Sequence, residues 1–361
     1  MPRRTFRVFG PTFIGPLAAL LLSALVISLT TERFLETRNL LNVSLQVSII
    51  AIMAIGSTVV ILTGGIDLSP GSMMALLTML MAMFVKWNNL SLAAATPLLV
   101  LLGCALGAIN GVMVAYLRIP SFIATLATLS AYKGWSFLYN NGSPIFSVSP
   151  DLEPIFYGSL LGIPLPFYYV LVCYLLASVF LKYTIPGREI YAVGGNEAAA
   201  RLSGIKVRRI HMLAYIIAGG TAGLASVVMA ARLNSGSPNY GAGMELQAIG
   251  AAVIGGASLS GGYGNVIATL IGALTIAVVQ NGLNLNDVPT SWQGITLGII
   301  IAAAVGIDRW RGEVGGLFSR VLRGGRRSRA LPAAPPEPSI PADPRQAVGG
   351  SQPAAGDQKD P

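Results

Sequence analysis

The sequence predicts an all-α integral membrane protein with about ten transmembrane helices. Hydrophobic residues make up 53% of its 361 residues and charged residues only 11%. The mean hydropathy is +0.66, which lies outside the range of ordinary soluble domains. The apolar residues fall into runs long enough to cross ~30 Å of hydrocarbon at 1.5 Å per residue. Many of the 42 glycines lie within these runs, where small residues let membrane helices pack closely.

Ten apolar windows are the predicted spans, and they lie near residues 12–30, 40–63, 68–86, 92–116, 121–139, 167–185, 209–231, 246–260, 265–283 and 292–308. The eighth window is short and rich in glycine, which predicts a broken or re-entrant element covered by protein or water. Gly103, Gly107 and Gly111 share one face of the fourth window, and Gly219 and Gly223 lie in the seventh. We expect these glycines to allow close helix packing rather than to line a path.

The distribution of Lys and Arg predicts the orientation, because basic loops stay on the cytoplasmic side. With both termini inside, the inner segments hold seventeen basic residues and the outer segments four. Residues 1–11 are then a cytoplasmic N-terminus, residues 12–308 the transmembrane domain, and residues 309–361 a basic and proline-rich cytoplasmic tail. We expect the end of this tail to be disordered because it has no apolar periodicity. The orientation of the chain in the membrane accounts for the positive net charge, so nucleic-acid binding need not be invoked.

Several function classes lack the residues that they require. No GxxxxGK[ST] segment occurs, so the chain has no nucleotide-hydrolysing loop of that type. Cys104 and Cys173 lie singly in apolar runs, and His211 is the single histidine, so we predict no metal site and no cofactor. An ion-driven carrier usually has acidic or histidine relays within its spans, whereas Lys133 is the clearest charge within a window. These absences favour a transport subunit, not an enzyme, whose energy source is on another chain.

Two glycine-rich segments share the pattern GGxxLSxG at an offset of 191 residues. The candidate turn residues are Gly64, Gly65 and Asp67 in the first copy and Gly255, Gly256 and Ser258 in the second. Both copies are expected at inner turns and to run the same way through the membrane, as a pseudo-symmetric pair around a pathway. The alternative is that each copy is only a tight turn whose glycines supply positive φ angles.

The segment 186–209 between the sixth and seventh windows predicts a short cytoplasmic helix. Gly194 and Gly195 are expected to form a turn, Asn196 is a good N-cap, Glu197 and Arg201 have i, i+4 spacing, and Gly204 ends the helix. Ala198, Ala199 and Leu202 share one small apolar face. This face is suited to docking in the groove of a partner protein, and the alternative is an interfacial helix that rests on lipid.

Polar side chains at membrane depth are the candidate pathway residues, because an amide without a partner is costly in hydrocarbon. These candidates are Asn110, Gln280, Asn281 and Asn284. A hydrogen bond between helices explains each of them equally well.

The chain resembles the membrane permease subunits of bacterial ATP-binding-cassette (ABC) importers for simple sugars, of the ribose, xylose and arabinose type. The resemblance covers about residues 40–309 and rests on TGGIDLSPGS, PSFIATLATL, GREIYAVGGNEAAARLSGI, GGASLSGGYG and IGALTIAVVQNGLNL. It implies the fold of an ABC importer permease in the bacterial inner membrane. It also implies that the segment from Asn196 to Ile205 is the coupling helix, with Asn196, Glu197, Ala198, Ala199, Arg201, Leu202 and Gly204 engaging the ATPase subunit. Pro70 departs from the small aliphatic residue usual at its position.

The implied mechanism is alternating access in a dimer of permease chains. The resemblance implies a cytoplasmic ABC ATPase subunit, a periplasmic sugar-binding protein and a second permease chain as partners, besides the membrane lipid. Two alternatives stay open, namely a permease for another small solute, such as a branched-chain amino acid or a polyol, and an ion-coupled secondary transporter. The identity of the sugar is not predicted.

Overall fold

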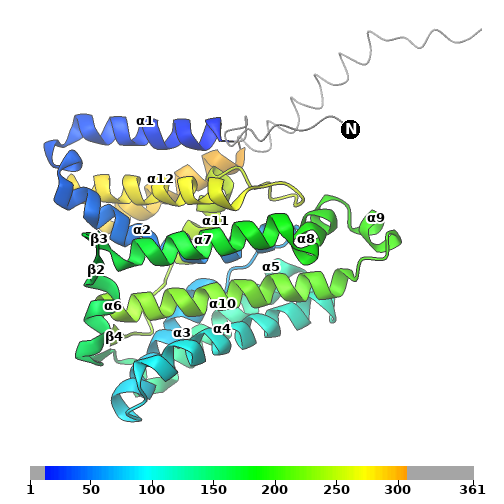
Figure 1. Ribbon diagram of the computed structural model, residues 1–361, viewed down its shortest axis with the longest axis horizontal. Helices are drawn as coiled ribbons and strands as arrows, with labels where there is room; N and C mark the ends of the chain where they lie inside the picture. The colour runs from blue at the N-terminus through cyan, green and yellow to red at the C-terminus, as the bar shows by residue number, and fades with distance from the viewer. Residues whose placement is uncertain (1–12, 307–361) are drawn as a thin grey trace, which may run out of the picture. The chain divides into compact units, whose positions relative to one another are not determined.

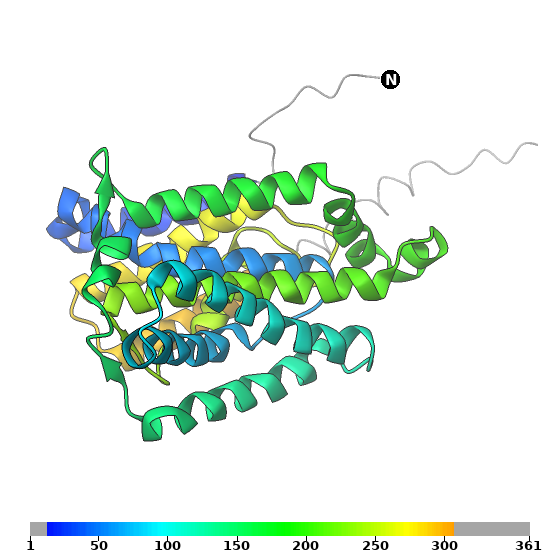
Figure 2. The same cartoon turned by 60° about the horizontal axis from the view of Figure 1, so that its bottom comes forward.

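The computed structural model describes residues 13–306, which form a bundle of helices that run between two ends (Figure 1). The α6 end carries the short segments between α5 and α7, and the α9 end carries the helix α9. The predicted N-terminus at residues 1–11 and the predicted tail at residues 309–361 lie outside the described residues. Figure 2 shows the same bundle from a second direction.

The first half of the chain contains these elements: α1 (Ile14–Thr30), the 3-10 turn η1 (Glu32–Leu35), α2 (Thr37–Leu62), α3 (Pro70–Ala82), its π-helical continuation η2 (Met83–Trp87), α4 (Leu92–Ala115), α5 (Ser121–Leu138) and the turn η3 (Tyr139–Gly142). The connection at the α6 end comprises β1 (Ile145–Phe146), η4 (Pro150–Leu152), α6 (Glu153–Tyr157), β2 (Ser159–Leu160) and β3 (Ile163–Pro164). The strands β2 and β3 pair as a small antiparallel hairpin.

The second half contains α7 (Leu165–Tyr183), α8 (Ile185–Gly195), α9 (Glu197–Leu202), α10 (Val207–Leu233), β4 (Ser235–Gly236), α11 (Met244–Ile254) and α12 (Val266–Leu285). A further apolar helix spans Thr290–Gly306. β4 pairs antiparallel with β1, with Ile145 opposite Gly236. This pair joins the segment after α10 to the segment after α5 at the α6 end.

The described residues contain six helices that are long and apolar enough to cross a membrane, namely α2, α3 with η2, α4, α7, α10 and α12. α1, α11 and the helix Thr290–Gly306 are apolar but shorter. Every one of the ten predicted windows overlaps a helix. The predicted class, an all-α membrane protein, is therefore confirmed.

α2 lies at the centre of the bundle. Its residues from Val47 to Leu62 are all buried, and it packs against α7, α10, α11 and α12. A helix that is apolar on all sides is buried on all sides, which explains why this long apolar run became the core. α1 and α7 instead expose many large apolar side chains, such as Leu22 and Leu176, as expected for helices that face lipid.

A seam of glycines holds α4 and α10 together. A β-carbon on Gly103 would overlap the carbonyl oxygen of Gly219, and one on Gly107 would overlap the carbonyl oxygen of Tyr215. A β-carbon on Gly219 would in turn overlap the carbonyl oxygen of Gly103. The prediction that these glycines serve close packing is confirmed, because the two backbones touch where side chains would separate them.

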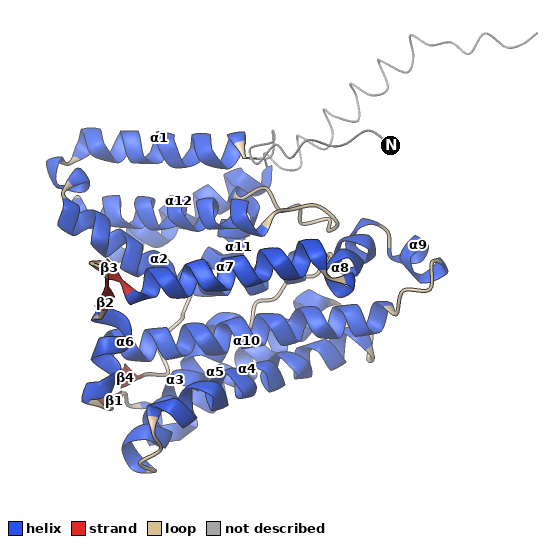
Figure 3. Cartoon of the chain, in the orientation of Figure 1, coloured by secondary structure: helices blue, strands red, loops and turns tan. Residues whose placement is uncertain are grey.

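Two segments without regular structure, residues 63–69 and 237–243, lie between the helices instead of only at the bundle's ends (Figure 3). The second leads into α11, which has only 11 residues and is therefore about 16 Å long. The prediction that the eighth span is short or broken is confirmed. Such backbone is tolerated at membrane depth where protein or water covers it.

Candidate functional site

The short helix α9 has the capping that the sequence predicts. The Asn196 side chain accepts a hydrogen bond from the Ala199 N–H at 2.9 Å, which satisfies a donor that the first helical turn leaves free. Arg201 donates to the Glu197 carboxylate at 2.7 Å. Gly204 has a φ of +84°, and the following Ile205 N–H donates to the Ala200 carbonyl. This αL glycine with its 6→1 bond ends the helix.

The two faces of α9 differ in exposure. Ala200 is buried against the bundle, whereas Ala198, Ala199 and Leu202 are exposed, and Leu202 is 91% exposed. α9 also lies at the outermost point of its end of the bundle (Figure 1). The chain therefore presents a small apolar face that no described residue covers.

The prediction of a turn at Gly194 and Gly195 is wrong, because both residues belong to the last turn of α8. Thr184 precedes α8 as its N-cap, and its side chain accepts a hydrogen bond from the N–H of Gly187 at 3.1 Å. Tertiary packing requires a residue without a side chain at Gly194. A β-carbon there would overlap the carbonyl oxygen of Leu62 and crowd the nitrogen of Gly262. The glycine thus permits the close approach of three segments instead of supplying a positive φ.

The two glycine-rich segments lie side by side at the α9 end. The N–H of Gly262 donates to the carbonyl of Leu62 at 2.9 Å. Gly64 and Gly256 have φ angles of +82° and +84°, and each ends its helix. The following residues, Gly65 and Ala257, donate back to Val60 and Ala252.

The register of the repeat is shifted by one residue from the sequence match. Sequence letters align Gly64 with Gly255, but Gly64 and Gly256 have the same role in the structure. Gly255 is instead held in helical conformation, and a β-carbon there would crowd the backbone of Thr269. Ser258, the sixth of these turn candidates, donates its N–H to the Tyr263 carbonyl. The helix-ending geometry is therefore shared, while the rest of each segment is not.

Asp67 lies in the segment between α2 and α3, beside the first turn of α5. Its side chain is buried, and its Oδ1 accepts from the Ser69 N–H at 2.9 Å and from the Ser69 hydroxyl at 2.7 Å. Its Oδ2 has no hydrogen-bond partner among the described residues. Burial raises the pKa of Asp67 to about 6, although the hydrogen bonds from Ser69 act to lower it.

Asn110, a pathway candidate, belongs to the same polar network. It is fully buried, donates to the Ser69 hydroxyl at 2.8 Å and accepts from the Thr128 hydroxyl at 2.7 Å. The network joins the irregular segment to α4 and α5. Sequence reasoning missed Ser69 and Thr128, because a small hydroxyl in an apolar helix carries no distinctive pattern.

The remaining pathway candidates lie on α12 and do not meet Asn110. Asn281 is buried and exchanges two hydrogen bonds with Asn39, at 2.9 and 2.8 Å. Asn284 is exposed near the end of α12 and accepts from Gln293 at 2.8 Å. Gln280 is half-buried, and no hydrogen bond joins its side chain to a described residue. The role of all four in a path stays a prediction.

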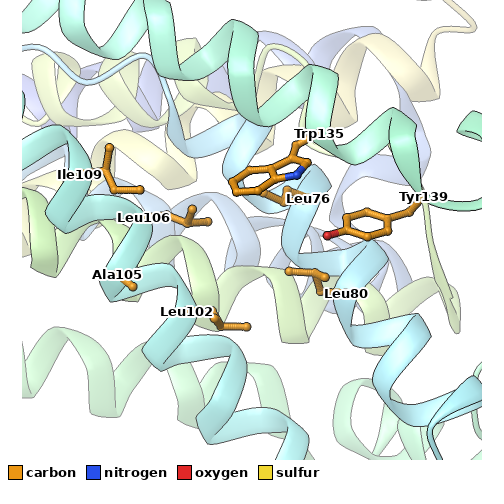
Figure 4. A pocket seen from close by; sticks show the side chains of 8 residues that line it. All are labelled: Leu76, Leu80, Leu102, Ala105, Leu106, Ile109, Trp135 and Tyr139. Carbon is orange, nitrogen blue, oxygen red and sulfur yellow. The ribbon is translucent and has the colours of Figure 1, made fainter.

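Two cavities differ in polarity. One of about 400 Å³ lies between α9 and the bundle, where Glu197, Arg118, Arg208 and His211 are among its lining residues. Another of about 150 Å³ lies between α3, α4 and α5, with apolar and aromatic side chains on its walls (Figure 4). The apolar cavity offers few groups that could bind a polar solute.

Comparisons with known proteins agree along most of the chain. A family model described as the branched-chain amino acid transport system / permease component matches residues 39–305. The ribose import permease protein of Escherichia coli strain K12 is 44% identical over 296 residues, which cover 81% of this chain and 92% of that protein. The D-allose permease protein of the same strain is 38% identical, over 78% of this chain and 86% of that protein. The xylose permease protein of Haemophilus influenzae is 34% identical, over 77% and 91%. No solved structure matches the chain.

Proposed function

The chain belongs to the branched-chain amino acid transport system / permease component family, and on this premise we propose that it is the membrane subunit of an ATP-driven importer of a monosaccharide. The observation that carries the proposal is its identity of 34–44% with permeases for ribose, allose and xylose along most of the chain. A family of permeases supplies a membrane path and not covalent chemistry. We therefore propose a transport component without an ATPase site of its own.

The proposed solute is a sugar of the ribose, xylose or arabinose type. The family description names branched-chain amino acids, but the relatives named above are sugar permeases. Their identity of 34–44% over 77–81% of this chain supports the sugar branch over an amino acid or a polyol.

The proposed energy source is a cytoplasmic ABC ATPase subunit that docks on α9. The exposed face of Ala198, Ala199 and Leu202 supports this proposal. The capped helix has fixed ends, because Asn196 and Gly204 satisfy its terminal backbone groups. A helix with fixed ends transmits a displacement to the α10 helix that follows it.

The remaining proposed partners are a periplasmic sugar-binding protein at the α6 end and a second permease chain, with both termini cytoplasmic. The paired segments β1 and β4 support a preformed surface at the α6 end. Alternating access between two chains would then move the sugar through the bacterial inner membrane.

Uptake in proteoliposomes tests this proposal. The chain is co-reconstituted with its ATPase subunit, with ATP enclosed and with binding protein and radiolabelled D-ribose, D-xylose or D-allose outside. We expect uptake of at least one sugar, and we expect it to require ATP hydrolysis and both partners.

The same vesicles separate the alternatives. Uptake by the chain alone under a proton or sodium gradient would establish a secondary transporter. Uptake of leucine but of none of the three sugars, with ATP present, would place the chain in the amino acid branch.

A further inference from the structure

The first turns of α3 and α11 meet inside the bundle. Gly71 is the second residue of α3, and Gly241 lies in the segment before α11. A β-carbon on either glycine would overlap the carbonyl oxygen of the other. The Glu245 carboxylate, in the first turn of α11, also lies against Gly71. Two irregular segments thus bring an acidic side chain to membrane depth.

A basic side chain reaches the same place from α5. Lys133 lies about 18 Å from Ser121 and about 8 Å from Leu138 along the helix, at 1.5 Å per residue. Its ammonium donates to the carbonyl of Pro238. Lys133 and Glu245 also lie close enough for their charges to interact.

These charges are part of a polar surface that is open to the outside of the chain. Lys133 and Glu245 are half-buried, and Asn239 and Ala242 are exposed. No hydrogen bond joins the side chain of Asn239 to a described residue. The surface formed by these four residues is called the broken-helix face below.

Lipid is an unsuitable neighbour for this face. Charged and amide groups at membrane depth need water or protein around them, because hydrocarbon offers no hydrogen bonds. The buried candidates Asn110 and Asn281 are different, since each already has partners within the chain. The unmet polar groups of the broken-helix face require an aqueous surface or another chain.

We propose that the broken-helix face lines the water-filled translocation path through the membrane. This inference rests on the proposed function and identifies residues that line the path of the sugar. Its one ammonium and one carboxylate compensate each other's charge, while the side-chain amide of Asn239 can donate and accept hydrogen bonds. Such a wall suits a neutral polyhydroxy solute better than an ion.

Thiol labelling tests whether water reaches this face. In a background in which Cys104 and Cys173 are replaced by serine, Ala242→Cys is treated with a charged methanethiosulfonate reagent. The matched control is Leu175→Cys on α7, an exposed position about 15 Å from the start of that helix, among apolar neighbours. We expect Ala242→Cys to react at least tenfold faster. Equal rates would overturn the proposal, because the face would then lie in lipid or in a dry contact.

Uptake kinetics test the polar groups. Glu245→Gln is expected to lower the maximal uptake rate at least tenfold while leaving membrane insertion and ATPase co-purification intact. A normal uptake rate for Glu245→Gln would show that the Glu245 carboxylate is not part of the path. The labelling result needs no sugar, so the failure of the proposed solute and the failure of this inference are distinguishable.

Discussion

At the scale of single residues, the carboxyl of Asp67 is buried away from water. It holds the segment between α2 and α3 through Ser69, and Ser69 connects it to Asn110 of α4. One carboxylate oxygen has no partner among the described residues, so ionisation of Asp67 is opposed by desolvation. Its charge state therefore affects how firmly the segment is held.

Asp67 is expected to make stability depend on pH. Its pKa in the folded chain is about 6, above the ordinary aspartate value of 3.8, so the folded state binds the proton more tightly than the unfolded state. The contribution of Asp67 to the free energy of unfolding is therefore greatest below pH 4 and falls as the pH rises to about 6. At 1.36 kcal/mol per pKa unit, the loss is about 3 kcal/mol.

Asp67→Asn should abolish this slope. Thermal unfolding in detergent, followed between pH 4 and pH 7, measures the difference between the variant and the parent. Asp151→Asn, in the exposed η4 segment, is the control and should keep the slope. A parent and an Asp67→Asn variant with parallel pH profiles would contradict the account.

At the scale of elements, α9 combines strong local capping with weak side-chain pairing. Both partners of the Glu197–Arg201 pair are more than half exposed, and such i, i+4 pairs contribute about 0.3–0.5 kcal/mol. The exposed apolar face is therefore the feature that a partner would recognise.

Ala199→Trp should separate docking from folding. The bulky side chain is expected to obstruct the docking face, so that the permease inserts normally but loses both co-purification with its ATPase subunit and sugar uptake. Glu197→Gln is the control for folding on the same helix: it removes only the weak i, i+4 pair and should leave membrane insertion unchanged. Normal co-purification and uptake with Ala199→Trp would show that α9 is not the coupling element.

At the scale of the whole molecule, the apolar runs predicted the positions of the helices. Each run forms a helix with a continuous apolar surface, which either packs against other helices or faces lipid. The partners across the bundle could not be predicted in this way. Asn281 meets Asn39 across 242 positions of sequence, and Gly194 is glycine because of Leu62 and Gly262. Local patterns at Gly194 and Gly195 favoured a turn, but tertiary packing placed them in a helix.

The orientation of the bundle in the membrane is the remaining prediction. Ser147 lies exposed in the connection between α5 and α7, and Ser203 lies exposed just after α9. With the two native cysteines replaced, an impermeant thiol reagent applied to intact cells should label Ser147→Cys and not Ser203→Cys. The basic residues around α9 motivate this outcome. Labelling of Ser203→Cys with protection of Ser147→Cys would reverse the orientation.

The seam of Gly103, Gly107 and Gly219 has a mechanical meaning. Side chains between two helices can change rotamer and absorb a shift, but two backbones in direct contact cannot. α4 and α10 therefore behave as one stiff strut. α10 has 27 residues, a length of about 40 Å, and it extends from α9 at one end to the irregular segment before α11 at the other. A displacement of α9 would therefore be transmitted along this rigid helix pair to that segment with little deformation of the pair.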